Sequence, residues 1–513
     1  MSGSSVPERR RRPVLLLVAL LLFSLLAVPF VEYRTDDTFI FLRFARNLAG
    51  GHGLSFNPGE PVYGFTAPLW VFLLAGITAV GLPPLAAAKA LAFLFGGAAI
   101  LGFAVLARRR LPPVVAGLAT VAFAANAWLT RWSAAAMETS LTTALVIWGL
   151  ARHAEEVESD LRHVPARWPL AALIFALAIL ARPEAVLLLV LVLATDSLGG
   201  PGARRRALAG AGVAGLVLVP WLAYCLATFG TLLPQTADAK GRLDPTRLDF
   251  DPLFDVARAI AATSAAEMVL IVVAAVSLWS WLARGSARLA WRRHAVALLW
   301  LAGLPLVYLV TGFDVLSRYV LPLIPVVVLY GFAALTHWVR GRALRPAAGA
   351  LLAFVLIQNA LVLKLVVYPH THRFSRGVED CLGEMGRWAA AHTPPGTTVA
   401  IADIGAFGYY SDRRVLDLAG LVSPELTPIV NQHPIDEIAA NLLFADRARP
   451  EYLVDRHPEP ERLAGAMGGT FEPITACRVE GLGVRSPAPI TYTLYRLHWD
   501  RYDDHAPAPA TAP

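Results

Sequence analysis

The 513-residue chain has few charged residues and few cysteines, and both shortages narrow what it can be. Charged residues make up 16% and hydrophobic residues 56%, which is typical of a polytopic membrane protein and excludes an ordinary soluble enzyme. The net charge of +7 gives no reason to expect a nucleic-acid partner, because the arginines fall in short clusters between apolar runs, as in cytoplasmic loops. The three cysteines lack zinc-site spacing, and a disulfide between Cys381 and Cys477 stays an open alternative.

The apolar runs predict about eleven transmembrane helices. The first, at 13–31, follows four arginines and is expected to be an uncleaved helix with its N-terminus inside. A shorter apolar stretch at 67–81 is expected to lie in the outer interface, because counting it as a span would place every later basic cluster outside. The other ten spans are expected at 85–107, 113–129, 139–151, 168–181, 185–198, 208–229, 265–282, 295–311, 319–338 and 347–367.

An odd number of spans places the C-terminal part outside. Residues 1–368 are expected to form the transmembrane domain, whose first outer loop at 32–84 carries interfacial helices. Residues 369–504 mix strand-like runs with helical stretches and are expected to form an α/β domain on the periplasmic or extracytoplasmic face. The Pro/Ala-rich tail at 505–513 is expected to be disordered. The predicted fold class is therefore a multi-pass α-helical protein of a bacterial cytoplasmic (inner) membrane with an outer α/β domain.

Two adjacent carboxylates, Asp36 and Asp37, follow the first apolar run on the side away from the basic N-terminus. One interpretation is that they only cap the helix-like run at 38–48, because carboxylates favour the positive end of a helix dipole. The other is that one carboxylate removes a proton from an acceptor hydroxyl, while its neighbour orients it, contacts the substrate or binds a metal ion. Both can hold together.

The rest of this loop has a specific pattern. Residues 47–70 read NLAGGHGLSFNPGEPVYGFTAPLW. Together with the acid pair, they resemble the first outer loop of a branch of the GT-C glycosyltransferases, close to the actinobacterial membrane arabinofuranosyltransferases that add terminal sugars to cell-wall arabinan. Further segments are similar to the same branch: 133–139 with Ala136 at a usual glycine, an R-P-E turn at 182–184, 229–240 with Gln235 at a usual asparagine, and 403–421.

The resemblance implies a sugar donor on a polyprenyl phosphate and a catalytic role for Asp36 and Asp37. Such a lipid needs cations at the membrane surface to hold the phosphate as charge develops. The outer-face candidates for this role are Lys240, Arg318 and Arg182. Candidate acceptor or substrate contacts are Glu138, Arg43, Asn57, Glu60, Tyr63, Thr66, Gln235 and Asp314.

Several of these residues have a structural alternative. Arg182 can snorkel to the interface, Arg318 can pair with Asp314 four residues earlier, and Lys240 can simply be solvated. Arg43 can lie on the polar face of an interfacial helix. Glu138 is harder to dismiss, because a carboxylate at membrane depth is costly unless it is used or paired.

These residues favour a glycosyltransferase that moves a sugar from a polyprenyl-phosphate donor to an envelope glycan, lipid or protein, with a carboxylate as the base. The pattern requires no cofactor; a divalent cation at Asp36 and Asp37 is an alternative that no ligand cluster demands. A transporter or flippase of lipid-linked sugars is disfavoured, because the span interiors are nearly all Ala, Leu and Val and no repeat is evident. An inactive member that only binds lipid-linked sugar is a third alternative. No motif encodes the sugar, the acceptor or which aspartate is the base.

Overall fold

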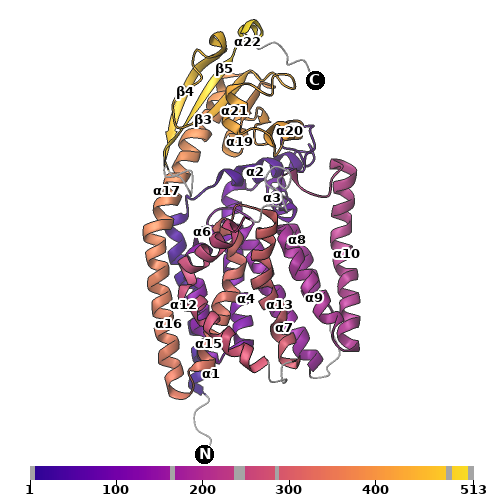
Figure 1. Cartoon of the computed structure of the whole chain (residues 1–513), viewed down its shortest axis with the longest axis vertical. Coiled ribbons are helices and arrows are strands. Elements are labelled where there is room, and N and C mark those ends of the chain that lie inside the picture. The colour runs from indigo at the N-terminus through magenta and orange to yellow at the C-terminus, as the bar shows by residue number, and fades with distance from the viewer. Residues whose placement is uncertain (1–5, 162–167, 236–248, 283–287, 481–487, 506–513) are drawn as a thin grey trace, which may run out of the picture.

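The computed structural model describes residues 6–161, 168–235, 249–282, 288–480 and 488–505. It is an elongated molecule in which a bundle of long helices carries a small α/β domain at one end (Figure 1). The N-terminus lies at the opposite end of the bundle. The bundle consists of α1 (Val6–Ala27), α4 (Pro84–Arg110), α5 (Pro113–Ala124), α6 (Ala127–Ser133), α7 (Thr139–Leu161), α8 (Leu170–Ala181), α9 (Val186–Ser197), α10 (Pro201–Phe229), α12 (Asp251–Leu282), α13 (Arg288–Thr311), α14 (Ser317–Val320), α15 (Ile324–Trp338) and α16 (Leu344–Val362).

Each of the predicted apolar runs overlaps one of these helices, because a long apolar run buries its backbone polar groups only as a helix. In the described part of the chain, seven helices are long and apolar enough to cross a membrane, or eight if α5 and α6, bent by 54°, count as one span. The bend falls at Asn126, whose side chain accepts hydrogen bonds from the amides of Trp128 and Leu129 and so starts α6 as a new helix. The total of eleven spans stays a prediction, since it also requires α7, α8 and α9 to cross.

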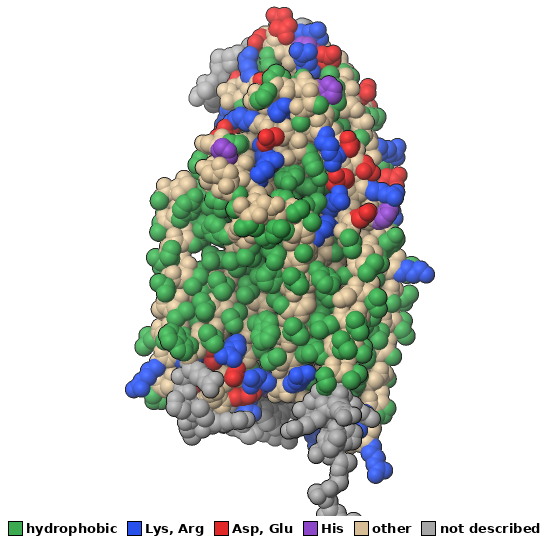
Figure 2. Space-filling view, turned by 180° about the vertical axis from the view of Figure 1, so that it is seen from behind, with side chains coloured by type: hydrophobic (Ala, Val, Ile, Leu, Met, Phe, Trp, Pro, Cys, Tyr) green, Lys and Arg blue, Asp and Glu red, His purple; other side chains and the backbone are tan. Residues whose placement is uncertain are grey.

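Figure 2 shows a broad hydrophobic band across the face of the bundle that is seen from behind, with charged side chains gathered above and below it. On the bundle helices, apolar side chains such as Leu94, Leu216 and Ile357 are exposed. An apolar surface of this extent is stable in lipid and not in water.

The first outer loop lies between the bundle and the α/β domain. It contains α2 (Asp36–Ala49) and α3 (Pro68–Ala79), preceded by the short 3₁₀ turn η1 (Val28–Phe30). Helix α2 packs against α3 on one side and against α19 (Gly405–Ser411) of the C-terminal domain on the other. The predicted interfacial stretch at 67–81 is therefore a short helix, α3, which buries Trp70, Val71 and Leu74 beneath α2.

The chain enters the C-terminal domain on a continuous helix that runs from Leu344 to His392. Helix α16 passes into the π-helical turn η5 (Leu363–Val367), then α17 (Tyr368–Gly377), the π-helical turn η6 (Val378–Gly383) and α18 (Glu384–His392). The domain boundary expected near residue 369 therefore falls inside this continuous helix, which joins the domain to the bundle without an intervening loop (Figure 1).

The C-terminal domain contains one five-stranded mixed sheet in the order β2-β1-β3-β5-β4. Strand β1 is parallel to β2 and β3, whereas β5 is antiparallel to β3 and β4. Alternate residues of the sheet face two cores: Val399 and Ile401 join the core that continues into the bundle, while Ala400 joins a separate outer core. The strands are β1 (Thr398–Ile401), β2 (Arg414–Asp417), β3 (Tyr452–His457), β4 (Phe471–Val479) and β5 (Ile490–Leu497), and the remaining elements are η7 (Pro424–Leu426), α20 (Thr427–Val430), α21 (Ile435–Ala440), η8 (Met467–Gly469) and α22 (Trp499–His505).

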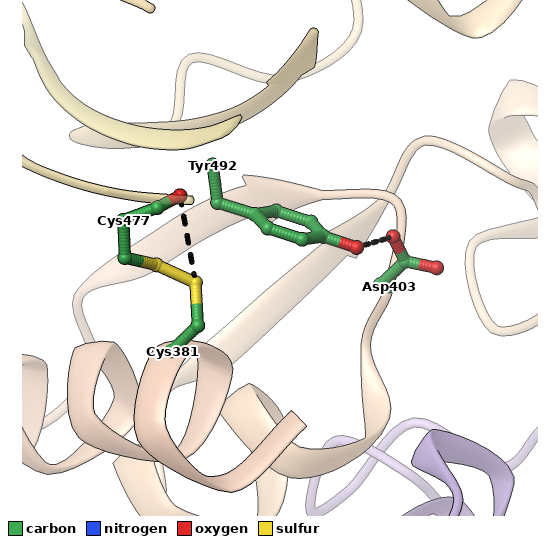
Figure 3. The surroundings of a disulfide bond; sticks show 4 residues. All are labelled: Cys381, Asp403, Cys477 and Tyr492. Carbon is green, nitrogen blue, oxygen red and sulfur yellow. Dashed lines mark hydrogen bonds between the residues drawn. A yellow bond between two sulfur atoms is a disulfide. The ribbon is translucent and has the colours of Figure 1, made fainter. Parts of the chain in front are cut away.

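A disulfide joins the helical entry to the sheet. Cys381 of η6 and Cys477 of β4 are bonded, with their Cα atoms 5.7 Å apart across 96 positions of sequence (Figure 3). Nearby, the Tyr492 hydroxyl donates a hydrogen bond of 2.6 Å to Asp403. The pairing that the sequence left open is thus formed in the structure.

Candidate active site

The first turn of α2 separates the two aspartates. The residue that caps α2 is Thr35, whose hydroxyl accepts a hydrogen bond of 3.3 Å from the amide of Thr38. Asp36 and Asp37 are the first two residues inside the helix, where the dipole still favours negative charge. Because Thr35 supplies the side-chain cap, both carboxylates are available for long-range contacts, and they contact different partners.

Asp37 pairs with an arginine from the far end of the bundle sequence. Its Oδ2 accepts a hydrogen bond of 2.5 Å from Arg318 Nη1 on α14. The other terminal nitrogen of Arg318 donates to the Tyr319 hydroxyl at 3.1 Å. The Asp37 side chain keeps 40% of its surface exposed, whereas that of Arg318 keeps 10%. The carboxylate is therefore fixed in place while part of its surface stays exposed. The alternative in which Arg318 pairs with Asp314 gives way to a pair with Asp37.

A second ion-pair group lies beside the first. Arg182, in the turn between α8 and α9, donates to Glu138 Oε1 from Nε and Nη2 at 3.0 and 2.9 Å, and to Glu184 Oε1 from Nη1 at 3.2 Å. Arg182 and Arg318 both lie over the ring of Tyr319, at 4.5 and 5.0 Å from its centre. Within the described residues, Glu138 Oε2 and Glu184 Oε2 are buried without a hydrogen-bond partner. Two carboxylate oxygens are thus left available for a ligand.

These two groups line a cavity of about 230 Å³ under the C-terminal domain. Its charged lining consists of three carboxylates and two guanidinium groups, while its remaining wall is largely apolar. The lining comes from α2 (Asp37, Ile40, Phe41), the first loop (Gly64, Phe65, Thr66), Met137, Glu138, Arg182, Pro183, Glu184, Leu233, Pro234, α13 (Val307, Tyr308, Thr311), Phe313, Arg318, Tyr319 and Leu421. A mixed lining of this kind suits a ligand with a polar head and an apolar body.

Asp36 turns away from this cavity and holds the C-terminal domain. Its two carboxylate oxygens accept hydrogen bonds from the backbone amides of Gly405 and Ala406, at 2.8 and 2.7 Å. Burial, together with the negative charge of Asp403, raises the pKa of Asp36 to about 7, although the two amides act in the opposite direction. Gly405 cannot carry a side chain here, because a Cβ would lie 2.0 Å from the Asp36 carbonyl oxygen.

Three predicted substrate contacts, Arg43, Asn57 and Glu60, also lie at this domain contact and not in the cavity. Arg43 is fully buried, and its Nε, Nη1 and Nη2 donate to the carbonyls of Phe56, Gly408 and Arg413 at 2.8, 2.5 and 2.7 Å. Burial lowers the pKa of Arg43 to about 9.

Asn57 and Glu60 bind β2, an edge strand of the sheet. The Asn57 amide exchanges two hydrogen bonds with the backbone of Val415, at 2.9 and 3.0 Å, as a neighbouring strand would. Glu60 pairs with Arg414 at 2.7 Å. The N-P-G-E part of the loop pattern therefore serves domain docking.

The remaining predicted residues divide between the cavity and its surroundings. Thr66, Glu138, Arg182 and Arg318 line the cavity with Asp37. Tyr63 is buried behind it, its ring stacked on Phe229, and its carbonyl accepts a hydrogen bond from the Gln235 amide at 2.9 Å. Asp314 lies in the exposed turn before α14 and does not line the cavity. Lys240 and the tail at 506–513 lie outside the described residues.

Three of the cavity residues that sequence reasoning missed are Glu184, Tyr319 and Leu421. Glu184 belongs to the R-P-E turn and Tyr319 follows Arg318, so both had a local signal. Leu421 comes from the C-terminal domain, and only the fold brings it to the cavity. Its loop is held by Asp417, whose carboxylate accepts hydrogen bonds from the amides of Ala419, Leu421 and Val422. The domain therefore supplies part of the cavity wall.

The fold is that of the GT-C membrane glycosyltransferases, as the sequence resemblance predicted. ArnT from Cupriavidus metallidurans, bound to undecaprenyl phosphate, is 15% identical with a TM-score of 0.59, over 94% of this chain and 97% of that chain. The Archaeoglobus fulgidus oligosaccharyltransferase in its apo form is 13% identical with a TM-score of 0.55, over 85% of this chain and 69% of that chain. The TM-scores show a similar fold, and at such low sequence identities the likeness extends to the fold alone.

A third similar structure is the arabinofuranosyltransferase AftD from Mycobacteria, which is 18% identical with a TM-score of 0.51. The match covers 96% of this chain and 42% of that one. Residues 370–499 match a family described as Domain of unknown function (DUF8728). No curated protein matches the sequence.

Proposed function

We propose that this protein is a glycosyltransferase that moves a sugar from a polyprenyl-phosphate donor to an envelope glycan, lipid or protein, with Asp37 as the general base. The observation that carries the proposal is the position of Asp37: a half-exposed carboxylate, fixed by Arg318, in a cavity between apolar helices and a docked polar domain. A base must be held in one geometry and still reach the acceptor hydroxyl. Asp36, which binds backbone amides, is assigned to positioning the C-terminal domain.

The location of the cavity and the similar structures support the proposed class of donor. One relative is described as bound to undecaprenyl phosphate and another as in complex with a dolichol-phosphate. The described charged lining has one more carboxylate than guanidinium groups, so a lipid phosphate would need added positive charge. We assign this role to Lys240, together with Arg318 and Arg182; a divalent cation is the alternative source. A sugar of the arabinofuranosyl type is the finer proposal, supported by the loop pattern of the sequence.

The proposed orientation places the cavity and the C-terminal domain outside the cytoplasmic membrane. The arginine clusters at 108–110, 204–206 and 340–345 lie at or between bundle ends away from that domain, which suits a cytoplasmic face. The disulfide between Cys381 and Cys477 supports an oxidising surrounding for the domain.

The test combines a cellular and a purified assay. Envelope glycans and glycolipids of a deletion strain are compared with those of its parent, and the missing sugar is then offered on a polyprenyl phosphate to the purified protein. Transfer by wild type and its loss in Asp37→Asn would support the proposal. Movement of the lipid across vesicles without transfer would instead identify a flippase, and binding without transfer an inactive member.

A further inference from the structure

A second buried group of polar side chains lies at the end of the bundle remote from the C-terminal domain. His153 and Glu156 are three residues apart on α7, so they share one face of that helix. Asp196 lies near the end of α9. The three residues are 4%, 9% and 1% exposed, and one ligand atom of each lies within 4.8 Å of those of the other two.

The buried His153 ring has polar nitrogen atoms whose hydrogen bonding is not satisfied by the described residues. Neither His153 Nδ1 nor Nε2 has a hydrogen-bond partner among the described residues. A buried polar group without a partner loses its hydrogen bonds to water and gains none in return, so native structures leave few of them unexplained. One of its ring nitrogens is close to both carboxylates, which places an unused nitrogen lone pair beside oxygen ligands.

The arginines around this group leave room for a cation. Arg206 donates to both oxygens of Asp196, at 2.8 and 2.6 Å, and to both oxygens of Asp160, at 2.7 and 2.8 Å. Arg292 is 3.6 Å from Asp160 and 3.8 Å from Asp196. With a neutral imidazole, the three carboxylates of Glu156, Asp160 and Asp196 exceed the guanidinium groups of Arg206 and Arg292 by one charge. Two further arginines nearby, Arg110 and Arg152, pair with Glu158 and Glu155. Glu156 Oε1 accepts a hydrogen bond from the Ala171 amide at 3.1 Å, and each carboxylate oxygen keeps a second lone pair beyond such a contact.

We propose that His153, Glu156 and Asp196 bind a divalent transition-metal ion, with Zn²⁺ as the best fit. One imidazole nitrogen and two carboxylate oxygens are a zinc-type ligand set, whereas Mg²⁺ and Ca²⁺ prefer oxygen alone. Zinc ligands lie about 2.0–2.2 Å from the ion, so two ligands of one tetrahedral ion are about 3.4 Å apart. The ligand atoms of the three residues, which all lie within 4.8 Å of one another, would therefore close around the ion by side-chain movements of about 1 Å. The ion would join α7 to α9 at this end and is independent of glycosyl transfer.

The first experiment measures metal in the full-length protein, purified in detergent without a polyhistidine tag. The protein is stripped with a chelator, incubated with Zn²⁺, desalted and analysed for bound metal. About one zinc per chain is expected, and His153→Gln and Glu156→Gln should each bind at least about tenfold more weakly, because even the loss of an outer-shell partner costs that much. His294→Gln is the matched control: this histidine lies at the same end but hydrogen-bonds to Tyr330 at 2.8 Å, so its loss should leave zinc binding unchanged.

A second variant keeps the test decisive if a substitution disturbs folding. His153→Cys places a thiolate where the imidazole was. Co²⁺ bound there should show a thiolate-to-cobalt charge-transfer band, which wild type and the His294→Gln control lack. That band, with zinc stoichiometry near one in wild type, supports the site. Wild-type zinc binding no stronger than that of His153→Gln, or a folded His153→Cys protein that binds Co²⁺ without the band, overturns it.

Discussion

Asp36 and Asp37 are neighbours in the sequence, but their carboxylates bind opposite parts of the molecule. Asp37 accepts a hydrogen bond from Arg318 of the bundle at 2.5 Å, while Asp36 accepts two from the backbone of α19 in the C-terminal domain. Consecutive helical residues point about 100° apart, so one turn of α2 can serve the cavity and the domain contact at once. This division of labour separates the expected effects of the two substitutions.

The first prediction concerns the base. Asp37→Asn keeps the shape of the side chain but cannot accept a proton, so sugar transfer should fall at least about a hundredfold. Asp36→Asn, which is outside the cavity, should reduce transfer by less than about tenfold. Initial rates with a saturating donor, normalised to folded protein, measure both. Equal losses in the two variants would contradict the assignment of Asp37 as the sole base.

The second prediction concerns domain docking. Asp36→Ala removes the acceptor of two backbone amides, so the contact between α2 and α19 should weaken by about 1–3 kcal/mol. Hydrogen exchange followed by mass spectrometry should show faster exchange in the peptide that contains Gly405 and Ala406. Asp412→Asn is the matched control, because asparagine tolerates the left-handed backbone at this position (φ +52°), and the pair of Asp412 with Arg46 at the same contact is solvent-exposed and contributes about 0–1 kcal/mol. Unchanged exchange in Asp36→Ala would remove the docking role.

The third prediction is a pH dependence of the same contact. The pKa of Asp36 is raised by burial and by Asp403 from 3.8 to about 7, and burial raises that of Asp417 to about 7 as well. The folded state therefore binds more protons than the unfolded state between these values. The stabilisation from these groups is complete below pH 3.8 and is lost as the pH rises through about 7. Arg456 partly offsets the negative charges that face Asp36.

Hydrogen exchange of the 405–411 segment tests this dependence, after correction for the intrinsic effect of pH. Protection should decrease from pH 5 to pH 8 in wild type. In Asp36→Asn the decrease should be smaller but still present, because Asp417 continues to titrate. A wild-type protection that rises across this interval would show that the carboxylates are stabilised in their charged form.

The fourth prediction concerns the lipid phosphate. If Arg318 and Lys240 hold it, then Arg318→Gln and Lys240→Gln should each raise the KM for the donor about tenfold or more, since a charge-assisted contact contributes about 1.5–3 kcal/mol. The KM for the acceptor should change much less. Arg292→Gln, at the opposite end of the bundle, is the control for a lost arginine. Donor titrations in which both variants match wild type would leave these cations with structural roles only.

Local sequence predicted the helices because length and hydrophobicity decide whether a segment forms a helix in a membrane, and each apolar run overlaps one. The acid pair was also found locally. The different roles of its two carboxylates were not found, because the partners of Asp37 and Asp36 lie 281 and about 370 positions away. The same reason explains Arg43 and Asn57: a conspicuous polar residue in a loop looks the same in sequence whether it binds a substrate or another domain.

The break between α5 and α6 had a readable signal that the span prediction did not use. Asn126 interrupts an apolar run, and asparagine is a favoured residue for starting a helix. Gly64 had a signal too, but its cause is distant: a Cβ there would lie 2.7 Å from the carbonyl oxygen of Leu421. The loop pattern thus records close contact with a domain more than 350 residues further along the chain.

The last prediction follows from a position at which this chain departs from the pattern that it resembles. Ala136 stands where that pattern has its usual glycine, and its φ is +55°, in the left-handed region that costs a residue with a Cβ about 1–2 kcal/mol. Ala136 is fully buried just before Glu138, so this strain lies at the edge of the cavity. Ala136→Gly should therefore raise the thermal midpoint in detergent by an amount that corresponds to about 1 kcal/mol. Ala135→Gly is the matched control: Ala135 is equally buried but has no positive φ, so the added chain freedom should lower the midpoint by an amount that corresponds to about 0.5–1 kcal/mol. Equal destabilisation by the two glycines would show that the backbone at 136 is not strained.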